Sequence, residues 1–211
     1  MASEADVALS AEQIRTDLAA VAALEPGIAR ALEQAGLPEP RASQPGYRTL
    51  LRTIVGQQVS VASASSVWNK LEALLGPEIP PEALLAAEFD ALRACGLSRQ
   101  KQGYARSLCA LVSESQLDLT ALPADDEEAI AALTQIKGIG RWSAEIYLLF
   151  AEGRPDIWPA GDLAVQAGIG KLLGLPARPD EKATRLLAEG WRPHRGAVAI
   201  LTWHCYNNPA L

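Results

Sequence analysis

The chain has 211 residues, 49% of them hydrophobic, which suits one sizeable core or two small lobes and excludes a multidomain machine. Its 38 alanines and 30 leucines outnumber the 20 valines and isoleucines, so the composition favours packed helices and argues against an all-β fold. The formal net charge of −6 argues, taken alone, against a polyanionic partner.

Apolar periodicity, bounded by Gly, Pro or Asp/Ser caps, predicts helices along the whole chain. In chain order they are expected at 10–24, up to 36, and at 47–55, 60–75, 81–85, 90–95, 100–113, 126–136, 142–151, 162–173, 181–190 and 194–206. Most connections are short, which predicts one compact α-helical body. We expect two lobes, one of about residues 46–157 and one formed by 1–45 plus 158–211.

The three cysteines, Cys95, Cys109 and Cys205, have no Cys-x-x-Cys spacing, so neither a disulfide framework nor a four-thiolate site is expected within the chain. They are predicted to be reduced core residues. His194 and His204 lack partner ligands at metal spacing and are predicted to be structural. No apolar run reaches about 18 residues and no signal peptide is recognisable, which predicts a cytoplasmic protein that does not enter a membrane.

Charge is sorted by segment along the chain. Residues 41–70 and 91–106 each carry four basic residues and no acid, whereas 71–90 and 107–136 are acidic. Such alternation can simply reflect solvated helix faces. It also leaves basic surfaces available to an anionic partner, despite the net negative charge.

Residues 133–144 place Gly138 and Gly140 around one apolar residue, between two predicted helices. The glycines permit a left-handed backbone and close approach of another chain. The second helix starts just after them, so its N-terminal amides form a natural anion site, flanked by Lys137 and Arg141. The alternative is a plain helical hairpin with Ile139 in the core.

Five motifs occur in one order over roughly residues 45–206: Ile54-Val-Gly-Gln-Gln-Val-Ser60, Gly96-Leu-Ser-Arg-Gln-Lys101, Ile136-Lys-Gly-Ile-Gly-Arg-Trp-Ser-Ala-Glu145, Pro159-Ala-Gly-Asp-Leu-Ala-Val-Gln166 and Trp191-Arg-Pro-His-Arg195. Together they resemble the DNA-3-methyladenine glycosylase II family of the helix-hairpin-helix DNA glycosylase superfamily. The resemblance implies an all-α, two-lobed fold with the active-site cleft between the lobes.

Asp162 opens a predicted helix and can act simply as its N-cap. The resemblance implies a second role, because this position matches the family's catalytic aspartate, which stabilises positive charge on the sugar as the base leaves. Strand-cleaving relatives carry a lysine after the Gly-x-Gly-Arg run, and this chain has Trp142 there. The resemblance therefore implies a monofunctional enzyme that leaves an abasic site intact.

Trp142 and Trp203 match tryptophans that line the family's base pocket, although a tryptophan on a helix is often ordinary core. Glu145 can touch substrate or pair with Arg141. An alkylated purine such as 3-methyladenine or 7-methylguanine carries positive charge, so electron-rich rings would hold it after it is flipped out of the duplex.

Gln57 and Gln58 lie where the family places the plug that fills the hole in the duplex, and Gln57 can alternatively cap a helix end. Besides Gln57 and Gln58, the expected contacts to DNA are Lys137, Gly138, Ile139, Gly140, Arg141 and Ser143, with Arg48, Arg52, Arg99 and Lys101 as candidate phosphate contacts. No cofactor is expected, although the resemblance allows a monovalent cation on the hairpin's carbonyls.

The sequence thus predicts a monomeric glycosylase that excises alkylated bases from double-stranded DNA in base excision repair, acting on nucleoid DNA. Three alternatives stay open. One is a glycosylase of the same fold for another damaged or mismatched base, and one is a non-catalytic helix-hairpin-helix module, which would not need Asp162. The third is a helical interaction protein without salt-dependent affinity for DNA.

Overall fold

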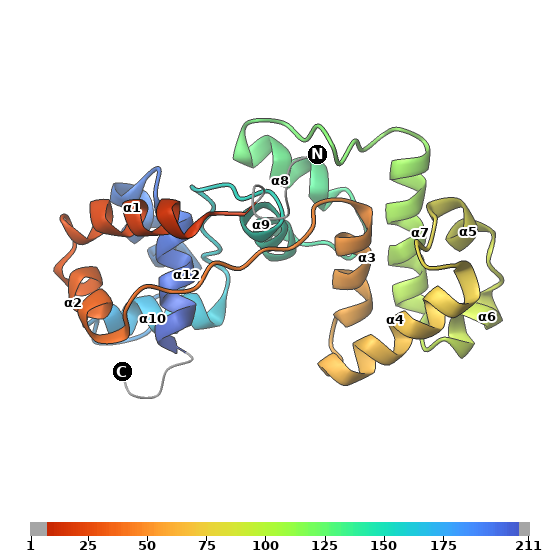
Figure 1. Ribbon diagram of the computed structural model, residues 1–211, viewed down its shortest axis with the longest axis horizontal. Coiled ribbons are helices and arrows are strands. Elements are labelled where there is room, and N and C mark those ends of the chain that lie inside the picture. Colours follow the sequence, from red (N-terminus) through yellow and green to blue (C-terminus); the bar gives the residue numbers. More distant parts are fainter. Residues whose placement is uncertain (1–7, 207–211) are drawn as a thin grey trace. The chain divides into compact units, whose positions relative to one another are not determined.

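The structure is a computed structural model that describes residues 8–206. The described residues contain helices and no strands, so the expected all-α class is confirmed (Figure 1). In order, the helices are α1 (Ala11–Ala22), α2 (Pro26–Ala35), α3 (Tyr47–Gly56), α4 (Val61–Leu75), α5 (Pro81–Ala86), α6 (Phe89–Ala94), α7 (Arg99–Ser113), α8 (Asp126–Thr134), α9 (Arg141–Phe150), α10 (Leu163–Leu172), α11 (Glu181–Leu187), the 3-10 helix η2 (Ala188–Trp191) and α12 (Arg195–Tyr206).

Side-chain caps explain why several of these helices begin close to where the sequence predicts. The Oγ atom of Ser60 accepts a hydrogen bond from the backbone N–H of Ser63, and Ser98 does the same for Lys101. A short polar oxygen in this position satisfies an amide that has no partner inside the helix. The same arrangement recurs at Ser10, Asp125, Asp162 and Asp180.

The chain forms two compact units. Unit 1 comprises residues 1–43 and 148–211, and unit 2 comprises residues 44–147. The second boundary lies within α9 and therefore earlier than the expected position 157. The reason is that the end of α9 and the segment after it bond to unit 1: the N–H of Ser43 donates to the carbonyl of Phe150 at 2.9 Å, and that of Gly196 to Pro155 at 2.7 Å.

Unit 1 packs α1, α2 and α10 around α12. Nearly every residue in the first two turns of α12 is buried, which is why this helix lacks a polar face. Each large aliphatic side chain buried in this way contributes about 1.5–3 kcal/mol. The core of the unit includes Ile14, Leu18, Ile28, Ile169, Val198 and Leu201.

Unit 2 centres on α7, which packs against α3 and α5, while α4 packs against α3. The hydroxyl of Tyr47 lies 3.3 Å from the sulfur of Cys109, and burial raises the pKa of that thiol to about 11. All three cysteines are buried and free, so the expectation of reduced core residues is confirmed. The core includes Leu50, Leu51, Ile54, Leu71, Leu84 and Leu108.

Both histidines have structural partners within unit 1. His204 Nε2 lies 3.0 Å from the carbonyl oxygen of Ala35 at the end of α2. His194 Nδ1 lies 2.7 Å from Oδ1 of Asp17, which is buried on α1. Within the described residues no group of His, Cys, Asp and Glu side chains is arranged to hold a metal ion, and no helix there is long and apolar enough to span a membrane.

An ion-pair cluster fixes the start of α12. Arg195 donates from Nε and Nη2 to the two carboxylate oxygens of Asp156, at 2.8 and 2.9 Å, and Arg192 donates to the same carboxylate at 2.9 Å. The Arg195 side chain is only 11% exposed. Removing the carboxylate would therefore leave this largely buried guanidinium with only a 3.5 Å contact to the exposed carboxylate of Glu189.

We expect Asp156→Ala to lower the free energy of unfolding by about 2–4 kcal/mol, as measured by urea denaturation. Arg15→Ala is the matched control, because Arg15 pairs with Glu12 on the exposed face of α1. Its change should stay within about 0.5 kcal/mol. Equal effects of the two substitutions would show that burial does not strengthen the Asp156 cluster.

Candidate functional site

The turn between α8 and α9 packs against residues of α7. Gly138 has a φ of 85°, in the left-handed region, and a Cβ atom built on it would lie 2.2 Å from the ring of Tyr104. The backbone N–H of Lys137 donates to Oγ of Ser107 at 3.1 Å. Only glycine satisfies both the backbone conformation and the contact with Tyr104, so this turn depends on position 138.

A second tether joins the turn to the connection between α3 and α4. Nε2 of Gln57 donates to the carbonyl of Gly138 at 2.8 Å. Gln57 is half-buried, whereas the next residue, Gln58, is exposed and has a φ of 55°. The two amides thus differ: Gln57 holds the turn, and Gln58 extends into solvent from a conformation that is uncommon for a non-glycine residue.

Ile139, between the two glycines, is 3% exposed. Its side chain lies in the core of unit 2, as the plain-hairpin alternative expects. The expectation that Ile139 contacts DNA is therefore limited to its backbone. Lys137, Gly138 and Gly140 are exposed around it, so the surface of the turn consists largely of main chain.

Arg141, at the start of α9, is paired with two carboxylates. Its Nη1 donates to Glu127 on α8 at 2.8 Å and its Nε to Glu145 at 2.9 Å. The hydrogen bonds that Arg141 donates to Glu127 are the main cause that raises the pKa of Arg141. The hydrogen bond from Nε confirms the expected pairing of Arg141 with Glu145, whose side chain is 2% exposed. The positive charge of Arg141 is compensated by Glu127 and Glu145.

Six of the residues singled out in the sequence line one open pocket of about 890 Å³ in unit 2: Gln57, Gln58, Lys101, Gly138, Trp142 and Ser143. Trp142 stands on the first turn of α9 and is 48% exposed. A tryptophan that serves only as core would be covered. The structure thus brings the α3–α4 connection, the α8–α9 turn and an accessible indole together.

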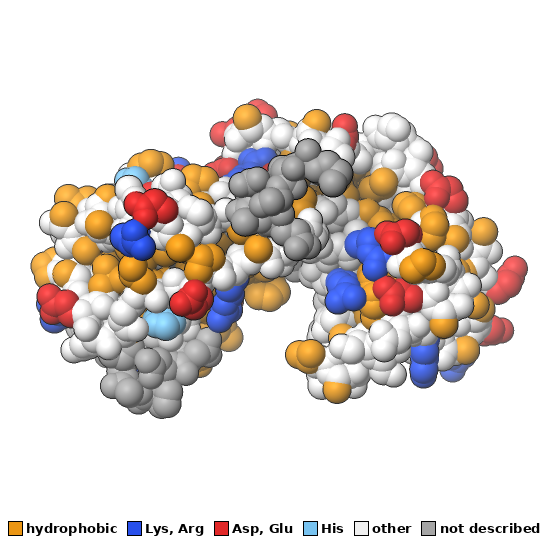
Figure 2. Space-filling model, in the orientation of Figure 1, with side chains coloured by type: hydrophobic (Ala, Val, Ile, Leu, Met, Phe, Trp, Pro, Cys, Tyr) orange, Lys and Arg blue, Asp and Glu red, His pale blue; other side chains and the backbone are white. Residues whose placement is uncertain are grey.

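The sequence analysis did not single out Tyr104, yet this residue also lines the pocket and supports Gly138. No local pattern could reveal this role, since the two residues are far apart in sequence. The exposed Val59 and Val61, 44% and 84% accessible, were likewise not singled out. Hydrophobic side chains protrude at the turn that joins α3 and α4 (Figure 2).

The four candidate phosphate contacts are engaged within unit 2. Arg48 pairs with Glu72 at 2.9 Å, and Arg52 stacks on the ring of Trp68 at 4.4 Å. Arg99 stacks on a phenylalanine, and Nζ of Lys101 donates to the carbonyl of Val55 at 2.7 Å. Basic and acidic side chains lie next to one another over α3 and α4 (Figure 2). Phosphate binding there would compete with these internal partners.

Asp162 caps α10 in unit 1. Its Oδ1 accepts hydrogen bonds from the backbone N–H groups of Ala164 and Val165, at 2.8 and 3.0 Å, and from Nε1 of Trp203 at 3.3 Å. Gln166 secures the preceding turn by donating to the carbonyl of Ala160 at 2.8 Å. The carboxylate is half-buried and its orientation is fixed from three directions.

Trp203 stands on α12 and is half-buried. Its ring lies 5.6 Å from that of Phe150, at an interplanar angle of 36°. The two expected residues of unit 1, Asp162 and Trp203, are therefore in direct contact. This contact combines a negatively charged group and an aromatic surface at the start of one helix, an arrangement suited to a cationic or positively polarised substrate.

Comparison with known proteins identifies the group to which these features belong. A family model described as HhH-GPD superfamily base excision DNA repair protein matches residues 51–193. The chain belongs to the HhH-GPD superfamily. This confirms the resemblance to helix-hairpin-helix DNA glycosylases, and the matched segment includes the α8–α9 turn and Asp162.

Individual relatives support the assignment of the chain to the HhH-GPD superfamily. The chain is 35% identical over 162 residues to DNA-3-methyladenine glycosylase 1 of Schizosaccharomyces pombe, covering 74% of this chain and 71% of the relative. A crystal structure of a DNA-3-methyladenine glycosidase from Bacillus halodurans superposes with a TM-score of 0.82 and 31% identity, covering 91% and 89% of the two chains. The S. pombe 3-methyladenine DNA glycosylase in complex with abasic DNA gives a TM-score of 0.75 and 29% identity, covering 90% and 95%.

Proposed function

We propose that the protein is a DNA glycosylase that flips alkylated bases of the 3-methyladenine and 7-methylguanine type out of duplex DNA and hydrolyses their N-glycosidic bond. The observation that carries the proposal is the carboxylate of Asp162, held at the start of α10 and bonded to Trp203. The names of the HhH-GPD relatives support the same substrate class.

In the reaction, the bond from C1′ of the sugar to the base nitrogen breaks, and the base leaves with the bonding electrons. Positive charge then develops on the sugar, where the negative charge of Asp162 lowers its energy. Water adds to C1′ and gives up a proton, with the Asp162 carboxylate as the acceptor. Because a methylated purine is already cationic, it can leave as a neutral base without first being protonated.

The product is an intact strand with an abasic site. Strand cleavage through a Schiff base needs an amine beside the sugar. The position after Gly-x-Gly-Arg is Trp142, whose indole N–H is not nucleophilic. The tryptophan at this position supports a purely hydrolytic enzyme. We propose that this enzyme requires no cofactor.

DNA binding is assigned to the α8–α9 turn and its pocket. The exposed main chain at Gly138 and Gly140, with the first amides of α9 and Ser143, offers N–H donors to a phosphate, and the exposed Lys137 adds a positive side chain beside them. Trp203, bonded to Asp162 in unit 1, offers an electron-rich ring to a cationic base, and Trp142 offers an exposed one in unit 2. Gln58 fills the hole left in the duplex, while Gln57 keeps the turn in place.

A monovalent cation could be held by backbone carbonyls of the turn, where it would add positive charge beside a phosphate. The carbonyls of Ile136 and Gly138 each accept one N–H hydrogen bond, at 3.0 and 2.8 Å. Each oxygen keeps a second lone pair, so these carbonyls are chemically suited to such an ion. We further propose that the protein acts as a monomer on chromosomal DNA in the cytoplasm.

The deciding experiment incubates the protein with duplex DNA treated with a methylating agent. Free bases are measured by chromatography, and strand breaks before and after alkali by gel electrophoresis. We expect release of 3-methyladenine or 7-methylguanine, with breaks only after alkali. Breaks before alkali would refute the hydrolytic assignment. Salt-sensitive binding without base release would indicate another lesion or a non-catalytic binder.

Substitutions of the two glutamines in the α3–α4 connection should affect different properties, DNA affinity in one case and stability in the other. Gln58→Ala is expected to lower affinity for duplex DNA containing an abasic site while leaving thermal stability unchanged, because Gln58 is exposed. Gln57→Ala should lower the free energy of unfolding by about 1 kcal/mol, since it removes the hydrogen bond to Gly138. Fluorescence anisotropy and urea denaturation measure the two effects. The reverse pattern would exchange the two roles.

A further inference from the structure

One face of α7 contacts both of the loops to which DNA binding is assigned. Tyr104 packs against Gly138 of the α8–α9 turn. Lys101, three residues earlier on α7, contacts the other loop, because its Nζ donates to the carbonyl of Val55 near the end of α3 at 2.7 Å. Residues three apart lie on the same face of a helix, so a single face of α7 supports both loops.

The carbonyl of Val55 needs a partner from outside its own helix. α3 ends at Gly56, so Val55 belongs to the last turn, whose carbonyls have no N–H ahead of them in the helix. The N–H of Gln57 bonds to the carbonyl of Ile54 at 3.4 Å, which is long for a hydrogen bond. The carboxyl end of a helix also carries partial negative charge, so an ammonium group is a well-matched donor there. Lys101 thus caps α3 from a neighbouring helix.

The ammonium group of Lys101 has little other compensation. The residue is half-buried and lines the pocket of about 890 Å³ in unit 2. Burial lowers the pKa of Lys101. No described acidic side chain forms an ion pair with it, whereas Arg48 and Arg141 are paired with glutamates. Because a half-buried charge costs free energy unless it is compensated, the contact with the end of α3 explains why a lysine can stand here.

The conformation of the α3–α4 connection depends on where α3 ends. Gln57 is tied to the carbonyl of Gly138 at 2.8 Å, and the exposed Gln58 follows it with a φ of 55°. A left-handed backbone is costly for a residue other than glycine, so it persists only where the neighbouring chain is held. Val55 and Gln57 are the two points at which the chain before Gln58 is held.

We propose that Lys101 is a positioning residue for DNA binding: its ammonium group fixes the end of α3, so that Gln58 is already held in the conformation that enters the duplex. In the proposed function, on which this inference rests, Gln58 fills the gap that the flipped base leaves. A side chain that is ordered beforehand loses less entropy on binding. The benefit arises only where the duplex has a gap to receive Gln58. Lys101 therefore increases affinity for DNA with an abasic site more than affinity for undamaged DNA.

The test measures the affinity of the full chain for a duplex with an abasic site and for the undamaged duplex of the same sequence, by fluorescence anisotropy. Lys101→Met removes the ammonium group and keeps the length of the side chain. We expect the preference for abasic DNA, which is the ratio of the two Kd values, to fall about fivefold or more. Lys101→Arg should restore most of it. Equal weakening on both duplexes with a smaller salt dependence would make Lys101 a phosphate contact and overturn the proposal.

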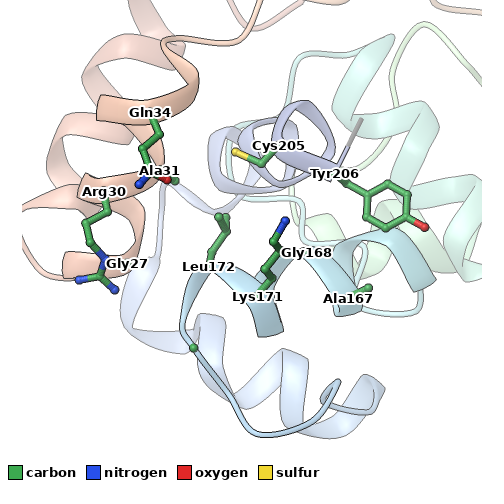
Figure 3. Close-up of a pocket in the computed structure, with 11 residues that line it drawn as sticks. Gly27, Arg30, Ala31, Gln34, Ala167, Gly168, Lys171, Leu172, Cys205 and Tyr206 are labelled. Atoms are coloured by element: carbon green, nitrogen blue, oxygen red, sulfur yellow. The ribbon is translucent and has the colours of Figure 1, made fainter. Parts of the chain in front are cut away.

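Lys171→Met is the matched control. Lys171 also stands in the last turn of a helix, α10, and lines a separate pocket of about 410 Å³ in unit 1 (Figure 3). The substitution removes the same charge outside unit 2 and should leave the preference for abasic DNA unchanged. A loss as large as that of Lys101→Met would show that net charge alone sets the preference, against the proposal.

Coupling with Gln58 separates positioning from general damage to the fold. In a Gln58→Ala background there is no side chain left to position, so Lys101→Met should change the preference for abasic DNA by less than about twofold. Independent losses that simply add would contradict the proposal. A wild type without preference for abasic DNA would refute the proposed function and this inference with it. A preference that persists in Lys101→Met would overturn this inference alone.

The free protein gives a second measurement that does not depend on DNA. NMR relaxation of the backbone amides of Gln58 and Val59 should show more motion in Lys101→Met than in the wild type or in Lys171→Met. The amides of α4, which Ser60 caps, should remain unchanged. If the amides of Gln58 and Val59 keep their wild-type relaxation in Lys101→Met, then Lys101 does not position the connection.

Discussion

Replacing Asp162 by asparagine is expected to reduce the rate of base release by about 100-fold or more while the protein stays folded. Asparagine caps helices about as well as aspartate, so the hydrogen bonds from Ala164 and Val165 can persist. Its side-chain oxygen can also keep the contact to Trp203. What disappears is the negative charge facing the sugar. Single-turnover release of 7-methylguanine from methylated duplex DNA measures the loss.

The chain provides a closely matched control. Asp125 caps α8 through Oδ1, which accepts from the backbone N–H groups of Glu127 and Glu128 at 2.9 and 3.0 Å. Asp125→Asn therefore changes the same group in the same helical setting and should leave the rate of base release nearly unchanged. If both variants lose activity equally, capping explains the effect and the chemical role of Asp162 is refuted.

DNA affinity separates chemistry from binding in the same pair of variants. Because Asp162 is assigned to the reacting sugar rather than to phosphate, Asp162→Asn should bind duplex DNA with an abasic site at least as well as the wild type does. Loss of a carboxylate also removes repulsion from the DNA backbone. A large drop in affinity would instead indicate that Asp162 organises the binding surface.

Helix boundaries could be predicted from the sequence because their causes are local. Ser60, Ser98 and Asp125 cap helices through groups two or three residues away, which sequence alone displays. The same holds for the ion pair between Arg141 and Glu145, one turn apart. The apolar periodicity of each helix similarly reports the face that it buries.

Contacts between distant segments could not be predicted. The unit boundary falls within α9 because the chain after it bonds to Ser43 and Gly196, which lie far away in sequence. Likewise, Glu127 compensates Arg141 from the other helix of the hairpin. Only the fold shows that both carboxylates compensate Arg141, so that a phosphate bound at the turn would depend more on main-chain amides than on the charge of Arg141.

The role of Asp162 illustrates the limit of local patterns. An aspartate at a helix start is explained completely by capping, and Asp125 and Asp180 do only that in the structure. Asp162 differs in its hydrogen bond from Trp203 on another helix. The family motif singled out Asp162 from the sequence, and its contact to an aromatic side chain distinguishes it structurally from the other two caps.

Gly138→Ala is expected to have the largest effect on the binding surface. A left-handed backbone costs a non-glycine residue about 1–2 kcal/mol, and forcing a methyl group against the ring of Tyr104 adds about 1–3 kcal/mol. We therefore expect the free energy of unfolding to fall by about 2–5 kcal/mol in urea denaturation. Affinity for DNA should fall as well, because the carbonyl that Gln57 holds would move.

The two contributions can be measured separately in a double-mutant cycle with Tyr104→Ala. In that background the contact is absent, so Gly138→Ala should cost only the backbone contribution of about 1–2 kcal/mol. Gly140→Ala is the control, since a Cβ atom there meets nothing within 4 Å and its φ is not positive. Its stability should remain within about 1 kcal/mol of the wild type. If the cost of Gly138→Ala is the same with and without the Tyr104 ring, then Tyr104 does not support the turn and backbone conformation alone explains the glycine.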